Sequence, residues 1–314
     1  MDIILQLMQV LTVFLLSPLL EGIVLQIESR INRGKGISIF QPYRDLWKLF
    51  HKQIVLPEGA SWIFWIIPII AMIIMLIVPM IIPIVTSFPL PLGAMGDILG
   101  GGFLLGLGGF FILLAGLEVG NSFGSMGSSR VVLINILGEP VMLLTLVGIA
   151  VFSKDMTPYN INHYIIKNPI LYWSPAHILL TVAFFIILLY ETGRMPVHSH
   201  SKDEIFMLDE SRILEYSGPL LGILKWAGMM KQFIFYTLFI NMLLIPWYLS
   251  TSHNIGWAFI AIAIIFVKYT LVVCAVVTVD TMQARLRFFR YQEPLVVAFI
   301  CAVLAIIISK FGLF

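Results

Sequence analysis

The chain has 314 residues, of which 60% are hydrophobic and only 11% are charged, and its formal net charge is +2. A soluble protein of this length would need far more charge to cover its surface, so the composition excludes a soluble globular protein and indicates an integral membrane protein. Cys274 and Cys301 lie in apolar stretches without metal-ligand spacing, which predicts neither a disulfide framework nor a cysteine metal site.

Eight apolar stretches are long enough to cross the hydrocarbon core of a bilayer, which takes about 20 helical residues. None of them alternates apolar and polar residues as the strands of a membrane β-barrel do. We therefore expect an all-α, polytopic membrane protein that forms a single domain over residues 1–314, with about eight transmembrane helices. The predicted spans are residues 3–26, 60–87, 98–117, 131–153, 170–190, 232–250, 256–279 and 294–313.

Between the first two predicted spans, the segment FQPYRDLWKLFHK is typical of an amphipathic helix. Its aromatic residues fall on one helical face and its basic residues elsewhere: Phe40, Tyr43, Trp47 and Phe50 against Arg44, Lys48, His51 and Lys52. The segment is too short to cross a membrane, so we expect a short helix at the membrane surface. Its basic side could face lipid headgroups or a docked partner subunit, and both interpretations stay open.

The second and third predicted spans are irregular. Pro68, Pro79 and Pro83 remove backbone donors from the second span and should bend it. The third span is rich in glycine between residues 100 and 116, which permits close packing of neighbouring helices.

The basic residues predict the orientation of the chain. Most of the 19 lysines and arginines lie in the loops that follow the odd-numbered spans, at about residues 27–59, 118–130, 191–231 and 280–293. By the positive-inside rule these loops are cytoplasmic, and both termini lie on the opposite side of the membrane.

Ionisable residues also lie within the predicted spans or at their ends, namely Glu118, Glu139, Glu191, Lys268 and Asp280. On insertion scales a charge at the centre of a bilayer costs about 2.5–3.5 kcal/mol, so such groups should have buried partners or a hydrated path. They could exchange protons, or they could form static ion pairs that hold the bundle together. Arg194 follows Glu191 at the i, i+3 spacing, so these two side chains could pair on one helix face.

A polar segment, ETGRMPVHSHSKDEIFMLDESRILEYSG, covers residues 191–218 between the fifth and sixth predicted spans. Its carboxylates include those of Glu204, Glu210 and Glu215. The chain contains no phosphate-binding loop, no dinucleotide fingerprint, no HExxH and no CxxC. We therefore predict a coupling surface that faces the cytoplasm, with no catalytic, cofactor or metal site in this chain and no nucleic-acid partner.

Separated motifs, in order, resemble those of the formate hydrogenlyase subunit 4 and hydrogenase-4 component C family: IFQPYRDLWKLF, AGLEVGNSFGSMGSSR, GEPVMLL, LEYSGPLLGILKWAGMMKQ and ARLR. ETGRMP followed by LEYSG is also similar to the ETNRxPFD…VEYSG loop of the membrane "heel" subunit of proton-pumping NADH:quinone oxidoreductase, complex I. The resemblance covers almost the whole chain and implies a fold like that of the complex I heel subunit.

The resemblance implies a non-catalytic subunit of a membrane-bound oxidoreductase complex in the cytoplasmic (inner) membrane of a prokaryote. Its expected partners are hydrogenase-like large and small subunits on the cytoplasmic side, antiporter-like membrane subunits and the lipid bilayer. Iron–sulfur clusters, and any nickel–iron centre, would belong to the partner subunits. Residues at matching places are Glu139, Glu191, Arg194, Glu215, Lys268, Arg285 and Arg287, with Asp280 where the family often has glutamate and Glu118 where it often has aspartate.

Two departures from the family pattern concern the coupling surface. Val131 follows Ser129 and Arg130 where the family has a glutamate, so one acidic site is missing. Residues 196–198 read PVH in place of PFD. Both argue against a complex I-like quinone cavity and against a strict copy of the complex I proton path.

The sequence thus predicts a membrane anchor and coupling subunit that links a cytoplasmic redox module to proton or cation translocation. The predicted coupling residues are Glu118, Glu139, Glu191, Arg194, Glu204, Glu210, Glu215, Lys268 and Asp280. The predicted partner interface comprises Arg44, Lys48, Arg130, Arg285 and Arg287. Two alternatives stay open: a stand-alone transporter for protons, cations or a small solute, and a purely structural anchor.

Overall fold

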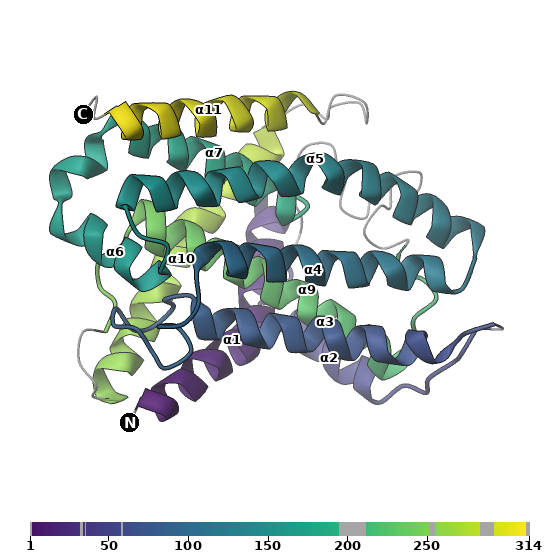
Figure 1. Cartoon of the computed structure of the whole chain (residues 1–314). Helices are drawn as coiled ribbons and strands as arrows, with labels where there is room; N and C mark the ends of the chain where they lie inside the picture. The colour runs from purple at the N-terminus through teal and green to yellow at the C-terminus, as the bar shows by residue number, and fades with distance from the viewer. Residues whose placement is uncertain are drawn as a thin grey trace.

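A computed structural model describes residues 2–31, 34, 36–57, 59–194, 212–250, 255–282 and 292–311. These residues form a helical bundle (Figure 1). Its elements are α1 (Asp2–Ile31), α2 (Gln41–Phe50), α3 (Trp62–Ile81), α4 (Ile98–Glu118), α5 (Ser122–Ser153), α6 (Pro158–Lys167), η1 (Pro169–Trp173), α7 (Pro175–Glu191), α9 (Gly218–Phe239), η2 (Ile240–Leu244), α10 (Ile255–Met282) and α11 (Gln292–Phe311).

Within the described ranges, seven helices are long and apolar enough to cross a membrane. They are α1, α3, α4, α5, α9 continued through η2, α10 and α11. The apolar α7 has 17 residues, which is the lower limit of length for a span. The prediction of an all-α, multi-pass membrane protein is therefore confirmed.

The helix bounds correct three of the predicted spans and loops. The sixth span was predicted to begin at residue 232, but α9 begins at Gly218, so Lys225 and Lys231 lie in a helix and not in a loop over 191–231. The fourth span begins at Ser122, which places Arg130 in α5 and reduces the predicted loop 118–130 to residues 119–121. The predicted second span, 60–87, ends already at Ile81.

The early start of α9 has a clear physical reason. Among the seven spans, the one that contains α9 is the least apolar and the most buried, because other helices surround it. A helix that does not face lipid can carry lysines, provided that these find partners inside the protein. The prediction from hydropathy therefore did not include the first half of α9.

Two short elements, α6 and η1, precede α7 and were not predicted. Each begins with a proline in its first turn, Pro158 and Pro169, a residue whose fixed φ suits the start of a helix. The fifth span consequently begins at Pro175 and not at residue 170, with the Ser174 hydroxyl accepting the N–H of His177 at 3.3 Å.

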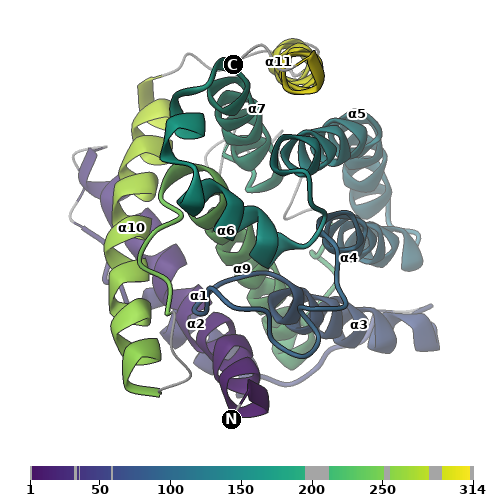
Figure 2. The ribbon, with the colours of Figure 1, turned by 60° about the vertical axis from the view of Figure 1, so that its left-hand side comes forward.

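Figure 2 shows α10 beside α1 at one edge of the bundle and α11 beside α7 and α5 at another. The central α9 contacts α1, α2, α3 and α7. In Figure 1 the start of α1 and the end of α11 lie at one end of the bundle, whereas the turn between α4 and α5 lies at the other. Both described ends of the chain thus lie on one side; that this side faces away from the cytoplasm stays a prediction.

Two helices end inside the bundle, and buried side-chain amides bind their free carbonyls. Gln9 of α1 donates from Nε2 to the carbonyls of Pro79 and Ile82 at the end of α3, at 2.6 and 2.7 Å. Asn162 of α6 donates to the carbonyl of Asn241 in η2 at 2.6 Å, and Asn241 donates to the carbonyl of Pro83 at 3.0 Å. Unwound backbone is tolerated at membrane depth only where such internal partners exist.

We expect Gln9→Leu to lower the free energy of unfolding by about 1–3 kcal/mol, because two buried carbonyls lose their donor. The matched control is Gln6→Leu, one turn earlier on α1. The Nε2 of Gln6 is buried and has no hydrogen-bond partner among the described residues, so this change should be neutral or stabilising. Unfolding of the purified chain in detergent, followed by circular dichroism, would measure both. Equal effects would contradict the capping role of Gln9.

Candidate functional site

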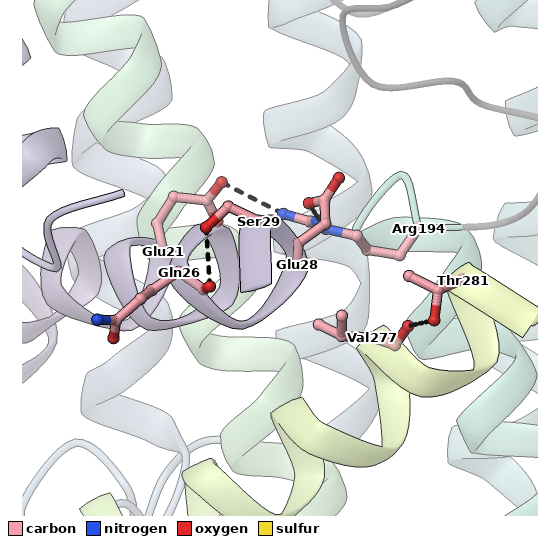
Figure 3. Close-up of polar contacts among 7 residues, drawn as sticks. All are labelled: Glu21, Gln26, Glu28, Ser29, Arg194, Val277 and Thr281. Carbon is pink, nitrogen blue, oxygen red and sulfur yellow. Dashed lines mark hydrogen bonds and ion pairs between the residues drawn. The ribbon is translucent and has the colours of Figure 1, made fainter. Parts of the chain in front are cut away.

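A buried arginine holds the end of α7 against α1. Gly193, at φ +65°, turns the chain out of the helix, and the N–H of Arg194 returns to the carbonyl of Leu189 at 2.8 Å. This places the guanidinium, which is 1% exposed, between two carboxylates of α1 (Figure 3). Arg194 Nη1 lies 2.8 Å from Glu28 Oε2, and Nη2 lies 3.3 Å from Glu21 Oε1. The buried positive charge is thus compensated by paired carboxylates.

A second ion pair joins α7 to α9. Glu191 Oε2 lies 2.8 Å from the Nζ atom of Lys231, and the two side chains are 10% and 20% exposed. Lys231 lies roughly 20 Å along α9 from its first residue, at 1.5 Å per residue, so the pair sits well inside the bundle. The predicted pair of Glu191 with Arg194 is wrong. The helix ends at Glu191, and beyond its end the i, i+3 spacing no longer places two side chains on one face.

A cavity of about 250 Å³ adjoins the Glu191–Lys231 pair, between α4, α5, α7 and α9. Apart from Thr192, its polar lining comes from Asn135, Glu191, Arg212, Lys225, Lys231 and Gln232. The volume is sufficient for several water molecules, and the polar lining offers them partners. Of the polar segment, the structure describes residues 191–194 and 212–218, and the backbone of Arg212 packs against Gly116 of α4. Arg194 thus pairs with carboxylates of α1, and Arg212 lines the cavity together with Glu191 and Lys231.

Glu139 lies in α5 and faces α4. Its side chain is half-buried, and it is close enough to Glu191 and Lys231 for electrostatic interaction. A Cβ atom built on Gly106 of α4 would lie 3.7 Å from the Glu139 carboxyl carbon, so the glycine leaves the carboxylate accessible from that side.

Glu118 is the last residue of α4, and Glu215 is bound by Asn121, three residues later. Glu118 Oε1 accepts the backbone N–H of Ser61 at 3.2 Å, and Asn121 donates to Glu215 Oε1. Tyr216 stacks in parallel on Phe64 of α3, with ring centroids 4.0 Å apart. Burial raises the pKa of the Tyr216 hydroxyl, and the nearby carboxylate of Glu118 raises it further.

The end of the LEYSG motif also contacts the segment that follows α2. Ser217 Oγ accepts the N–H of Val55 at 2.7 Å and donates to its carbonyl at 3.0 Å. Gly218 adopts φ +55°, and a Cβ atom there would lie 2.7 Å from the carbonyl oxygen of Gln53. A side chain at this position is excluded both by the backbone conformation and by the close approach of residue 53.

Lys268 binds backbone and not a carboxylate. It is 3% exposed, and its Nζ donates to the carbonyls of Ile245 and Trp247 at 2.8 and 2.5 Å, where the chain has left η2. A cation at the carbonyl end of a helix is electrostatically favourable. These contacts favour the structural interpretation of Lys268; its role in ion coupling stays a prediction. Asp280, half-buried near the end of α10, interacts electrostatically with Tyr236.

The amphipathic helix is confirmed, but its buried face differs from the aromatic one. Pro42 and Leu46 of α2 are buried, whereas Trp47 is 68% exposed. Arg44 and Lys48 are exposed, as a docking or headgroup surface requires. Arg130 is half-buried in α5. Four other predicted residues lie outside the described part of the chain: Glu204, Glu210, Arg285 and Arg287.

Sequence reasoning missed three members of the ionic network, Glu21, Glu28 and Lys231. Glu21 and Glu28 are seven residues apart, which places them on one face of α1, two turns from each other. Two glutamates at that spacing, near the end of an apolar span, could have indicated a paired carboxylate site on α1. Lys231 could not be recognised because its helix was predicted to begin too late.

The sequence model of the family described as NADH dehydrogenase matches residues 3–310. Formate hydrogenlyase subunit 4 of Escherichia coli (strain K12) is 29% identical over 288 residues, covering 91% of this chain and 92% of the relative. Hydrogenase-4 component C of the same strain is 28% identical over 313 residues, covering 99% and 97%. A subunit of the NADH-quinone oxidoreductase of Helicobacter pylori (strain G27) is 30% identical over 204 residues, covering 60% and 58%.

The fold also matches a chain in the solved structure of the membrane-bound sulfane sulfur reductase, an archaeal respiratory membrane complex. The TM-score is 0.79 at 20% sequence identity, and the match covers 97% of this chain and 99% of the other. At this identity the likeness shows the fold. Because the family match extends over nearly the whole described bundle, this chain belongs to the NADH dehydrogenase family.

Proposed function

We propose that the chain is the membrane anchor and coupling subunit of a hydrogenase-4-like or formate hydrogenlyase-like assembly related to complex I. In this role it links a cytoplasmic redox module to the translocation of protons or cations. The observation that carries the proposal is the buried ionic network: Arg194 with Glu21 and Glu28, and Glu191 with Lys231, beside a polar cavity. Intramembrane charges arranged in this way are typical of ion pathways.

The polar segment supplies the connection from the redox module to the network. Its Arg194 is held by the carboxylates of α1, and its Arg212 lies on the wall of the cavity. A redox step in a docked module would displace the segment and change the contacts of both arginines. A conformational shift needs such a difference in contacts between two states.

The carboxylates provide the next step of the proposed mechanism. When the Glu191–Lys231 pair loosens, the ammonium group of Lys231 becomes available to Glu139, because both acids interact with it. Charge then moves from the cavity toward the α4–α5 side of the bundle. Electrons stay in the partner subunits, which would carry the iron–sulfur clusters and any nickel–iron centre.

The test is Glu191→Gln and, separately, Glu215→Gln in the assembled complex. We expect the number of ions translocated per electron to fall about tenfold with Glu191→Gln, because an amide cannot hold the charge of Lys231. Glu215→Gln should have a smaller effect in the same direction. Electron transfer between soluble donor and acceptor should stay within about twofold, since no redox centre is altered.

Asp155→Asn is the matched control. Its carboxylate lies in the loop after α5, at the other end of the bundle, where the N–H of Thr157, at 2.8 Å, lowers its pKa. It should leave the ratio of ions to electrons unchanged. If Glu191→Gln also leaves that ratio unchanged, the coupling role is wrong and the chain is a structural anchor.

A further inference from the structure

The face formed by α4 and α5 contains a groove of about 540 Å³. The two helices pack side by side on the near face of the bundle in Figure 1. Apart from one residue, the groove is lined by apolar side chains and glycines, and Phe103 and Phe110 at its rim are 63% and 54% exposed. The exception is Glu139, whose carboxylate faces the groove past Gly106.

Glu139 lies near the middle of α5. At 1.5 Å per residue it is roughly 25 Å from the start of α5 and roughly 20 Å from its end. Among the described residues its carboxylate has no hydrogen bond or ion pair. Lys231, a cation that interacts with it, is already bound to Glu191 at 2.8 Å.

A carboxyl group in this position needs a partner beyond the described residues. Ionisable groups within membrane spans face the protein interior, a water-filled cavity or a paired group, because lipid chains offer no compensation. Even the protonated acid loses free energy when its polar atoms are buried without a hydrogen bond. An acyl chain could fill the apolar groove but could not satisfy Glu139, whereas a polar side chain on a neighbouring helix could do both.

We propose that the α4–α5 groove receives a transmembrane helix of a second membrane subunit, and that a basic, amide or hydroxyl side chain at the middle of this helix donates a hydrogen bond to Glu139. Small residues at the floor of the groove suit such close helix approach, because Gly106 leaves the backbone of α4 accessible. The inference rests on the part of the proposed function that makes the chain a subunit of a membrane assembly. It does not depend on ion translocation.

The experiment places a photoreactive benzoylphenylalanine at position 103 of the full chain in the membranes of its own host. Illumination should yield an adduct with a membrane protein whose apolar span carries a hydrogen-bond donor near its centre, identified by mass spectrometry. The yield should fall about tenfold with Glu139→Ala, which corresponds to the loss of one hydrogen bond to a charged group. The matched control is Ile136→Ala, which is exposed on the same helix but does not line the groove, and its yield should be unchanged.

Two further variants separate loss of the contact from loss of the fold. Gly106→Leu fills the groove and covers the Glu139 carboxylate while leaving residue 139 a glutamate, and it should also abolish the adduct. Replacing the donor on the captured helix with leucine should lower the yield as Glu139→Ala does, and combining the two changes should lower it no further. Three outcomes would overturn the proposal: adducts with lipid alone, adducts with a second copy of this chain, or a partner whose adduct yield does not change with Glu139→Ala. The experiment measures contact between helices and not ion translocation. A complex that assembles but does not couple electron transfer to ion translocation would therefore refute the coupling role and leave this inference intact.

Discussion

Replacing Arg194 with leucine is expected to destabilise the folded chain by about 3 kcal/mol, because Glu21 and Glu28 would keep their charges without the arginine between them. We place the cost at the lower end for a broken buried ion pair, since the two glutamate side chains are still 15% and 20% exposed. Unfolding of the purified chain in mixed micelles, titrated with sodium dodecyl sulfate, would measure the change.

The control for Arg194→Leu is Lys48→Leu. Lys48 also pairs with a carboxylate, that of Asp45 at 3.8 Å, but the two side chains are 66% and 53% exposed. Such a pair contributes less than about 0.5 kcal/mol. Combining Arg194→Leu with Glu21→Gln and Glu28→Gln should recover part of the loss, because the uncompensated charges disappear together. A triple variant no more stable than Arg194→Leu would show that packing and not charge sets the cost.

Substituting alanine for Gly138 is expected to disrupt the Glu191–Lys231 pair from a distance. A Cβ atom at Gly138 would overlap the ring of Tyr190, the residue immediately before Glu191. The ring and the end of α7 must move, and overpacking of this kind costs about 1–3 kcal/mol. We therefore expect reduced stability in detergent together with a loss of ion translocation per electron as large as that of Glu191→Gln.

Gly101→Ala is the matched change for Gly138→Ala. It lies in the neighbouring helix α4, and no heavy atom outside its own helix backbone lies within 4 Å of the Cβ that would be added. Alanine is favoured over glycine in a helix by about 1 kcal/mol, so this variant should be as stable as the original or more so. If Gly138→Ala behaves like Gly101→Ala, the end of α7 can adapt and Tyr190 does not position Glu191.

The helices that face lipid could be predicted from the sequence, because lipid contact requires an uninterrupted apolar surface. The spans of α4 and α10 were predicted to within a few residues, and α2 was recognised from its amphipathic pattern. Prediction failed where a helix is shielded from lipid. Lys225 and Lys231 were assigned to a loop, although α9 contains both, and Lys231 is paired with Glu191 of the neighbouring helix α7.

The charged residues of the candidate site were identified individually, but their partners were not. Local spacing suggested Glu191 with Arg194, yet each found a partner far away along the chain: Lys231 for the first, and Glu21 and Glu28 for the second. Lys268 stood out as an isolated charge within an apolar span. Its partners are backbone carbonyls just after the end of η2, which side-chain patterns do not reveal.

By itself the sequence determined the class of the protein, its family resemblance and the residues that carry charge into the membrane, because hydropathy and motifs are properties of local composition. Only the tertiary structure decided which charges are compensated within the chain and which one faces outward. Ion pairing depends on distances between helices, and the turn at Gly193 and the packing of α1 against α9 set those distances. Arg194 is thereby enclosed within the bundle, while Glu139 is left facing a groove that a neighbouring helix can fill.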